Sequence, residues 1–381
     1  MNHDVRVGIL SALALSASVS VAACSPSGAS RVTPPASAPT RVLSAAQAQP
    51  AVAQPASIGR LATYNIDPAK VFVAGISSGG FFGVQMHVAH SRTFKGAAIY
   101  AGGVYFCADD SVAVALASCG GEGLYTSMLA PSETYLDLQS SLATIDPEER
   151  LEGQPVYLWS GTKDTVVNPA AMNDLRAEYA HYGAQIRYDN AFPAEHGRES
   201  PDGELACGTL GSPFMVRCDR GAASSVAAGA GAYDSQQTWL KMFLGRLEPR
   251  REGSLRGRLV NFDQTEFGAA ASNSMDTNGY AFVPRACADG ARCALVLALH
   301  GCLQTQADIG TKFITQSGID AWADTNRIIV LYPYTVKSMA LPVNPQGCWD
   351  WWGYDDPQYA LKSGTQVSIV YKMIERVTGR R

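Results

Sequence analysis

Residues 71–80 read VFVAGISSGG, and the rest of the chain is organised around this stretch. Its first four residues, Val71–Ala74, are apolar and include two β-branched valines, which is typical of a strand buried in a parallel sheet. The following residues 81–90, FFGVQMHVAH, have the composition of a helix packed on such a sheet. The stretch therefore predicts a strand, a tight turn and a helix in succession.

The turn itself is Gly75-Ile76-Ser77-Ser78-Gly79, which matches the pattern G-x-S-x-G. In this pattern the serine lies at a strained strand-to-helix bend, and the flanking glycines keep Cβ atoms out of a crowded turn. The frame selects Ser77 rather than Ser78. Because Gly-Ser-Ser-Gly also occurs in ordinary flexible turns, it is the flanking strand and helix that favour a nucleophile at Ser77.

The composition is that of a globular protein with a substantial core. Of the 381 residues, 46% are hydrophobic and 17% are charged, which is unlike a disordered chain. The net charge of -4 and the sequence pI near 5.9 give no basic field, and the sequence has no cluster of Lys and Arg. A nucleic-acid partner is therefore excluded.

The first 24 residues have the layout of a secretory signal peptide. Arg6 precedes an apolar, small-residue run over 7–23, which is too short and too rich in Ala and Ser for a membrane span. The run ends Val-Ala-Ala-Cys at Cys24, which resembles the lipobox of bacterial lipoproteins. Two alternatives follow. Either Cys24 is lipidated and tethers the protein to the outer membrane, or the signal is cleaved and the protein is secreted to the periplasm or the medium.

Three segments are expected along the chain. A signal peptide covers 1–24, and a disordered linker rich in Pro, Ala, Ser and Gln covers 25–57. Residues 58–381 form the folded domain. Strands are predicted at 71–74, 96–102, 155–161, 184–190, 258–262, 280–283, 294–299 and 327–332. Helices are predicted at 81–90, 169–183, 224–245, 307–325 and 366–377. This alternation predicts a doubly wound, mostly parallel α/β sheet in one domain.

Eight cysteines remain once Cys24 is set apart, and an even number in an exported chain predicts disulfides. Sequence spacing suggests the pairs Cys107/Cys119, Cys207/Cys218 and Cys287/Cys293, which leaves Cys302 with Cys348. A zinc site is the alternative, but none of these cysteines has a CxxC partner or a nearby pair of histidines. No metal is expected.

A serine nucleophile needs a base, and the base needs an acid that fixes its tautomer. The α/β-hydrolases supply these groups in the chain order Ser, Asp or Glu, His. Asp164 directly follows a predicted strand, whereas Asp174 falls within a helix. His196 lies in a loop beside a glycine, whereas His181 lies at a helix end, where histidine is common. We therefore predict Ser77, Asp164 and His196 as the catalytic residues.

The oxyanion of an acyl-transfer intermediate needs two backbone N–H donors. One is expected from Ser78, the residue after the nucleophile, and the other from a loop that follows a different strand. His300-Gly301-Cys302 follows the apolar strand predicted at 294–299 and resembles the HGGG-type oxyanion motif. We predict the amides of Ser78 and Cys302 as the oxyanion hole, with His300 behind the loop rather than acting as the base.

The order of these parts along the chain is unusual. In the ordinary α/β-hydrolase fold the oxyanion strand precedes the nucleophile strand, whereas here the His-Gly-Cys loop lies more than 200 residues after Ser77. The last predicted helix, 366–377, is the one that would ordinarily lead into the elbow strand. We therefore expect a circularly permuted α/β-hydrolase fold, since permutation is tolerated where the chain ends meet at the surface.

Five features occur together: GISSGG at 75–80, the triad order, HGCLQ at 300–304, WADTNRIIVLYP at 322–333 and NPQGCWDWWGY at 344–354. Together they resemble the extracellular poly(3-hydroxybutyrate) depolymerases, and most of all the single-domain, circularly permuted kind known from fungi. The likeness extends over roughly 61–377. It implies hydrolysis of a polyester through an acyl-enzyme, with the triad and oxyanion residues given above and without a cofactor.

Four aromatic side chains lie close together in the sequence: Trp349, Trp351, Trp352 and Tyr354. Amphipathic rings suit an apolar ester chain, so this cluster is the predicted substrate-binding surface, with Trp349 as the first choice for the cleft. The alternative is that the rings fill the core beside Cys348. We expect this protein, unlike the wider family, to have a low-complexity segment in front of the catalytic domain and no appended binding module after it.

The leading hypothesis is a secreted serine esterase that hydrolyses poly(3-hydroxybutyrate) or a related short-chain polyhydroxyalkanoate, and we expect it to act as a monomer. One alternative is a feruloyl or carbohydrate esterase, because related exported esterases share the elbow and HGC motifs. A second alternative is a surface-tethered binding protein that has kept a hydrolase fold without activity.

Overall fold

The computed structural model describes residues 58–120, 125–222 and 231–380. These residues fall within one compact unit. The predicted signal peptide and linker, and with them Cys24, lie outside the described residues. Within the described ranges, none of the helices combines the length and the apolarity needed to cross a bilayer.

An eight-stranded sheet forms the centre of the fold, in the order β4-β3-β2-β1-β10-β11-β9-β8. Neighbouring strands are parallel from β4 to β11, and β9 and β8 are antiparallel to their neighbours. The strands are β1 Ile66–Ile76, β2 Ala97–Tyr100, β3 Pro155–Trp159, β4 Gln185–Asp189, β8 Arg258–Asp263, β9 Asn278–Val283, β10 Cys293–Leu299 and β11 Ile328–Tyr332. A smaller sheet contains β5 Arg198–Glu199, β6 Leu205–Ala206 and β7 Met215–Arg217. The predicted mostly parallel α/β sheet is confirmed.

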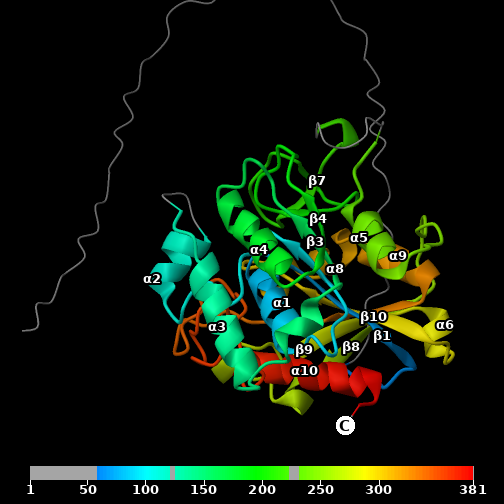
Figure 1. The fold of residues 1–381 in the computed structure, drawn as a ribbon. Helices are drawn as coiled ribbons and strands as arrows, with labels where there is room; N and C mark the ends of the chain where they lie inside the picture. The colour runs from blue at the N-terminus through cyan, green and yellow to red at the C-terminus, as the bar shows by residue number, and fades with distance from the viewer. Residues whose placement is uncertain (1–57, 121–124, 223–230, 381) are drawn as a thin grey trace, which may run out of the picture. The chain divides into compact units, whose positions relative to one another are not determined.

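Helices cover both faces of the large sheet (Figure 1). They are α1 Ser78–Ala89, α2 Val112–Val114, α3 Leu129–Ser141, α4 Pro169–His181, α5 Ser235–Leu244, α6 Arg285–Ala288, α7 Gln306–Ile309, α8 Lys312–Gln316, α9 Ile319–Asn326 and α10 Thr365–Thr378. Helices α1, α4 and α10 pack on one face, and α5, α8 and α9 pack on the other.

Strand β10 shows how the sheet separates two apolar cores. Its residues Leu295 and Leu297 belong to the core beneath α1, α4 and α10, whereas Val296 and Ala298 belong to the core beneath α5 and α9. Successive side chains of a strand point to opposite faces, so an uninterrupted apolar run is required when both faces are buried. This explains why the sequence of β10 shows no polar alternation.

Two helix predictions are wrong. The segment predicted as one helix at 307–325 is divided into α7, α8 and α9, because Gly310 and Gly318 adopt φ angles of 59° and 72°, which end a right-handed helix. In the described part of the segment predicted as a helix at 224–245, residues 231–234 are not helical, and α5 begins at Ser235, where the Asp234 side chain accepts a hydrogen bond from the backbone N–H of Gln237. Residues 224–230 of this prediction lie outside the described residues. The sequence pattern also gave no prediction for α3.

The two ends of the described domain lie against each other. The backbone N–H of Tyr64 donates to the carbonyl of Val377 at 2.9 Å, and the Thr63 hydroxyl donates to the carbonyl of Arg376 at 2.8 Å. These contacts place the end of α10 beside the segment that enters β1. The last helix of the domain thus meets the strand that begins it.

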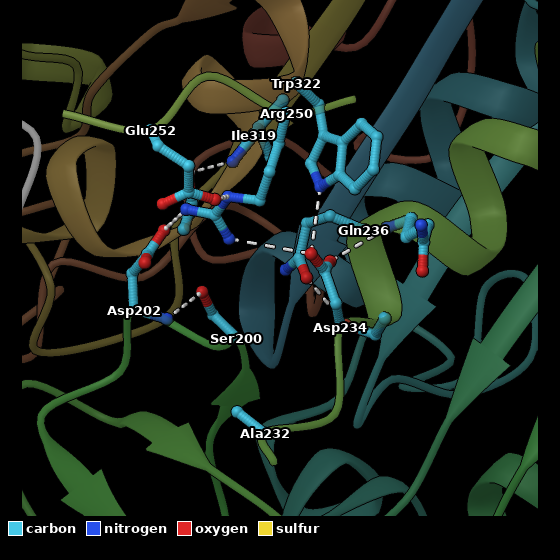
Figure 2. A network of polar contacts seen from close by, with 12 residues as sticks. Ser200, Asp202, Ala232, Asp234, Gln236, Arg250, Glu252, Ile319 and Trp322 are labelled. Carbon is cyan, nitrogen blue, oxygen red and sulfur yellow. Dashed lines mark hydrogen bonds and ion pairs between the residues drawn. The ribbon is translucent and has the colours of Figure 1, made fainter. Parts of the chain in front are cut away.

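A charged network fixes the segment that follows β5 (Figure 2). The Arg250 guanidinium lies 2.6 Å from Asp202 Oδ2 and 3.5 Å from Asp234 Oδ2. Asp234 also accepts a hydrogen bond from the Trp322 indole N–H at 3.0 Å, so the network links α5, α9 and the loop after β5. Its side chains are largely buried, and a buried charge is tolerated only when it is paired in this way.

Candidate active site

Ser77 occupies the tight turn between β1 and α1. Its φ and ψ angles are 56° and -126°, a conformation that non-glycine residues rarely adopt. A Cβ atom on Gly75 would lie 1.9 Å from the carbonyl oxygen of Gly79, and one on Gly79 would lie 2.2 Å from that of His300. Both glycines are therefore required, and the strand, turn and helix predicted around Ser77 are confirmed.

The two serines of the turn have different surroundings. Ser77 is half-buried, whereas Ser78 is buried with 2% of its surface exposed. The Ser78 hydroxyl accepts a hydrogen bond from the backbone N–H of Trp349 at 3.4 Å. Of the two hydroxyls, that of Ser77 is thus the one open to a reactant.

Asp164 and His196 form a buried pair. His196 Nδ1 lies 2.9 Å from Asp164 Oδ2 and 3.1 Å from Oδ1, with side-chain exposures of 5% and 1% respectively. Asp164 Oδ1 also accepts the backbone N–H groups of Val166 and Val167 at 2.9 and 2.8 Å. A carboxylate at Nδ1 places the proton of a neutral imidazole there, which leaves Nε2 with the lone pair of a base.

The loops that carry this pair are joined by their backbones. The N–H of Thr162 donates to the carbonyl of Phe192 at 2.8 Å, and the N–H of Lys163 donates to that of Ala194 at 3.1 Å. A Cβ atom on Gly161 would lie 2.2 Å from the Ala194 carbonyl, so only glycine permits this approach. The distance between the acid and the histidine is thus set by contacts between the two loops.

Ser77, Asp164 and His196 lie at the same edge of the sheet. They follow the carboxyl ends of β1, β3 and β4, which are parallel members of one run of strands. In open α/β sheets this edge is where ligands bind. Within the described residues, no hydrogen bond joins the Ser77 hydroxyl to the His196 ring; such contacts commonly tighten only when substrate is bound.

The two residues that were weighed against this assignment lie elsewhere. His181 is in the last turn of α4, with 56% of its side chain exposed, and its Nδ1 lies 3.9 Å from a carboxylate oxygen of Glu133. Asp174 lies on α4 and accepts hydrogen bonds from the hydroxyls of Tyr125 and Ser127. Neither pairs with the other groups of the site.

The His-Gly-Cys loop follows β10, the neighbour of β1 on the side opposite to β2. A Cβ atom on Gly301 would lie 3.0 Å from the Cβ of Ser77, so the loop is held against the serine. Among the hydrogen bonds of the described residues, neither the Ser78 N–H nor the Cys302 N–H has a protein acceptor. Two unpaired amides beside a reactive hydroxyl are what an oxyanion hole requires.

Gln304 supports this loop, although the sequence pattern did not single it out. Its Oε1 accepts the N–H of Gly301 at 2.6 Å, and its Nε2 donates to the carbonyl of Pro213 at 2.7 Å. The side chain is buried with both ends paired, and it joins the oxyanion loop to the segment between β6 and β7. A glutamine three residues beyond a His-Gly pair was the available signal.

The prediction for Trp349 is wrong, because its ring lies in the core rather than in a cleft. The residue has 0% exposure, its ring stacks on Phe82 of α1 at 4.8 Å, and its Nε1–H donates to the carbonyl of His300 at 3.0 Å. The preceding residue, Cys348, is also buried and forms a disulfide with Cys302. A fully covered indole cannot contact a polymer, so Trp349 supports the site from behind.

The other aromatic residues of the cluster are half-buried. Trp351 stacks on Phe81 at 4.3 Å, and Trp352 contacts the rings of Trp351 and Tyr354 at 5.3 and 4.8 Å. The Tyr354 hydroxyl is directed inward and donates to the carbonyl of Cys348 at 2.9 Å. Phe81 was not predicted; its position two residues after the second elbow glycine was the available signal.

The cysteines of the described residues form four disulfides, as spacing suggested: Cys107–Cys119, Cys207–Cys218, Cys287–Cys293 and Cys302–Cys348. The last of these joins the oxyanion loop to the residue that precedes Trp349. Among the described residues, no group of three or more His, Cys, Asp and Glu side chains is arranged to hold a metal ion.

Comparison with known proteins places this geometry in a family. The chain is 36% identical over 326 residues to the poly(3-hydroxybutyrate) depolymerase of Delftia acidovorans, covering 84% of this chain and 61% of that protein. It is 33% identical over 332 residues to the polyhydroxybutyrate depolymerase of Talaromyces funiculosus, covering 83% of this chain and 92% of that protein. No protein-family model matches the chain.

Solved structures agree with these relatives. The crystal structure of the PHB depolymerase from Penicillium funiculosum matches with a TM-score of 0.75 and 31% identity, over 84% of this chain and 99% of that one. A PHB depolymerase with a serine-to-alanine substitution, complexed with an R3HB trimer, matches equally well, with a TM-score of 0.75. The fold is thus of the α/β-hydrolase type, and the chain belongs to the polyhydroxybutyrate depolymerase family.

Proposed function

We propose that this protein hydrolyses poly(3-hydroxybutyrate), or a related short-chain polyhydroxyalkanoate, to oligomers and monomers as a serine esterase. The observation that carries the proposal is the buried Asp164–His196 pair, at the same sheet edge as the strained, half-buried Ser77. The names of the relatives, and the R3HB trimer bound by one of them, support a polyester substrate.

In the first step, Ser77 Oγ attacks an ester carbonyl carbon while its proton passes to His196 Nε2. The resulting imidazolium is stabilised by Asp164 at Nδ1. The negative charge on the former carbonyl oxygen is stabilised by the amides of Ser78 and Cys302. The ester C–O bond then breaks, and the leaving alkoxide takes the proton from His196, which leaves an acyl group on Ser77.

The second step releases the acid. Water attacks the acyl carbon while His196 Nε2 takes its proton, and the same two amides stabilise the second oxyanion. Collapse of this intermediate breaks the bond to Ser77 Oγ, which recovers its proton from His196. The products are a shortened chain and a 3-hydroxybutyrate oligomer or monomer.

The half-buried rings of Trp351 and Trp352 are the proposed contact surface for the polyester, and the buried Phe81 supports Trp351 by stacking on it at 4.3 Å. Phe81 lies in the first turn of α1, close to Ser77 in the chain, and belongs to an apolar cluster that Trp351 and Trp352 cover. Flat apolar rings next to the nucleophile suit a neutral ester chain with methyl branches. Tyr354 acts as the anchor of the loop, since its hydroxyl is bonded inward.

We further infer that the chain is a circular permutant of the usual fold. The strand order places the oxyanion strand β10 directly beside the elbow strand β1, although β10 comes much later in the sequence. The end of α10 is hydrogen-bonded to the segment that enters β1, as expected if this helix ordinarily leads into the elbow strand. A chain in which the end of α10 is joined directly to residue 64, with new chain ends opened in another loop, should therefore fold and keep its activity.

Export is proposed from the first 24 residues and from the disulfides. Four disulfides in a domain of this size are typical of oxidising compartments. Either Cys24 is lipidated and anchors the protein to the outer membrane, or the mature protein is a released monomer with residues 25–57 as a spacer. Mass spectrometry of the mature N-terminus distinguishes these cases, because lipidation leaves a modified Cys24 as the first residue.

The direct test is turnover of an opaque poly(3-hydroxybutyrate) suspension by the mature protein, with product sizes measured by mass spectrometry. The suspension should clear, and Ser77→Ala should abolish clearing while the melting temperature and the disulfides are retained. Clearing by Ser77→Ala at the wild-type rate would reject the nucleophile.

The two alternative functions give different outcomes in the same assay. A feruloyl or carbohydrate esterase would hydrolyse soluble feruloyl or acyl esters and leave the suspension opaque. An inactive binding protein would do neither, and a fluorophosphonate probe would form no adduct at Ser77.

A further inference from the structure

His300 is enclosed by aromatic rings at the end of β10. Its ring centroid lies 4.9 Å from that of Tyr334, 5.4 Å from that of Trp349 and 6.2 Å from that of Phe313. The side chain has no exposed surface, and burial lowers the pKa of His300 to about 4. The imidazole is therefore neutral at neutral pH, the condition in which one ring nitrogen donates and the other accepts.

The two neighbours of the ring determine which nitrogen carries the proton. His300 Nδ1 lies 2.7 Å from the Gly301 carbonyl oxygen, which can only accept. His300 Nε2 lies 3.2 Å from the backbone nitrogen of Thr335, which can only donate. The Thr335 hydroxyl lies 3.3 Å from Nε2 and gives its proton to the carbonyl of Gly347 at 2.6 Å. The contact at Nδ1 is the shorter one, and a proton on Nε2 would face the N–H of Thr335. The neutral ring is thus fixed as the Nδ1–H tautomer.

The carbonyl that accepts this proton belongs to the same peptide group as the N–H of Cys302. In a trans peptide the C=O and N–H bonds are coplanar and point in opposite directions. A hydrogen bond that holds the Gly301 oxygen on the His300 side therefore directs the Cys302 N–H to the other side. Gly301 is itself in close contact with Ser77, which makes that direction the one in which an oxyanion would form.

Two further side chains hold the backbone of this loop. The Trp349 indole N–H holds the carbonyl of His300 at 3.0 Å, and Gln304 holds the N–H of Gly301 at 2.6 Å. These bonds fix the peptide before Gly301. Among the described residues, the imidazole is the only hydrogen-bond partner of the Gly301 carbonyl, which belongs to the peptide that carries the Cys302 amide. We propose that His300 is a positioning residue that aims the Cys302 amide at the oxyanion through its Nδ1–H bond to Gly301.

This inference rests on the proposed function, because it concerns the oxyanion hole of that reaction. Two substitutions test the hydrogen bond to Gly301 and the hydrogen bond to Thr335 independently. His300→Asn keeps an N–H donor at the position of Nδ1, since both nitrogens are attached to Cγ. His300→Gln places its amide at the position of Nε2 and so keeps a partner for Thr335 while losing the donor to Gly301.

The readout is kcat and KM on a soluble p-nitrophenyl ester. His300→Gln should lower kcat by about 10- to 100-fold with KM changed by less than about threefold, somewhat less than the loss of a whole oxyanion donor. His300→Asn should remain within about fivefold of the wild-type kcat. If the ring only fills space, the two variants would lose activity alike and in proportion to their fall in melting temperature, which would overturn the proposal.

A spectroscopic measurement keeps the inference testable if the variants do not fold. In full-length Ser77→Ala protein with ¹⁵N-labelled histidine, His300 should show a proton on Nδ1 and none on Nε2 at neutral pH. An Nε2–H tautomer would overturn the proposal without any change at His300. Failure of the proposed function is distinguishable, because the wild-type protein would then leave a poly(3-hydroxybutyrate) suspension opaque, whatever the tautomer of His300.

Discussion

His196 and His300 both follow a strand at the carboxyl edge of the same sheet, yet they have opposite chemistry. His196 faces the Asp164 carboxylate, which stabilises a positive imidazolium. His300 faces a carbonyl and an amide N–H, which accommodate only the neutral ring. The partner of a histidine, rather than its nearness to the nucleophile, thus decides whether it can act as a base.

The loops that carry the two histidines also differ in how they are held. The His196 loop is tied by backbone hydrogen bonds to the loop of Asp164, and the Cys207–Cys218 disulfide closes a short segment after it. The His300 loop is tied by Cys302–Cys348 to a segment much later in the chain. Its position therefore depends on long-range contacts, whereas the acid and base are brought together by neighbouring strands.

The largest expected effect comes from removing the base. His196→Ala should lower kcat on a soluble ester by about 10⁴-fold or more, because this variant lacks the imidazole proposed to take the proton of Ser77. The control is His181→Ala, which should retain wild-type kinetics because its side chain is exposed on α4. Equal losses of kcat in the two variants would show that His196 is not the base.

Removing the negative charge of Asp164, the partner of His196, should lower kcat nearly as much. Asp164→Asn keeps the shape of the side chain but no longer enforces the Nδ1–H tautomer, so kcat should fall by about 10³- to 10⁴-fold. The melting temperature should show that the variant remains folded. A loss below about tenfold would mean that His196 does not depend on Asp164.

The two disulfides should differ in their contribution to stability. Cys302→Ser with Cys348→Ser opens a loop with a sequence separation of 46, and Cys207→Ser with Cys218→Ser opens one of 11. Loop-closure entropy predicts losses of about 4 and about 3 kcal/mol in the free energy of unfolding, measured by urea denaturation. The variant without Cys302–Cys348 should also have a lower kcat per folded molecule, since that disulfide holds the loop that carries the Cys302 amide. The reverse order of stabilities would contradict the entropic argument.

The smallest expected effect concerns His90, another buried histidine. Among the described residues, its Nε2 has neither a carboxylate nor a backbone group as a partner. Burial is the main cause that lowers the pKa of His90 to about 3 from an ordinary 6.5. Below pH 6.5 the unfolded chain takes up the proton first, so stability is full above that pH and falls as the pH drops towards 3.

His90→Phe should therefore reduce the loss of stability between pH 7 and pH 5 by about 2 kcal/mol. The phenyl ring can keep the stacking on Tyr371, which lies 3.6 Å from the histidine ring. Urea unfolding at both pH values measures the effect, with His181→Ala as the exposed control. An unchanged pH dependence would show that His90 is not neutral in the folded state.

Local features were predictable because they depend on residues close in the chain. The glycines at 75 and 79 reveal the elbow, since no other residue fits the bend. Asn168 before Pro169 reveals the start of α4, where the Asn side chain accepts the N–H of Ala170 at 3.0 Å. Gly310 and Gly318 are local signals of the same kind for the breaks in the segment predicted as one helix at 307–325, although the prediction did not use them.

The alternation of strands and helices, the serine at the turn and the cysteine pairs suggested by spacing could all be read from the amino-acid sequence. The packing of Trp349 on Phe82 and the tautomer of His300 could not, because they arise from contacts formed in the folded chain. Backbone geometry and capping are set by near neighbours, whereas the burial of a ring and the partner of each nitrogen depend on segments that meet only when the sheet has formed.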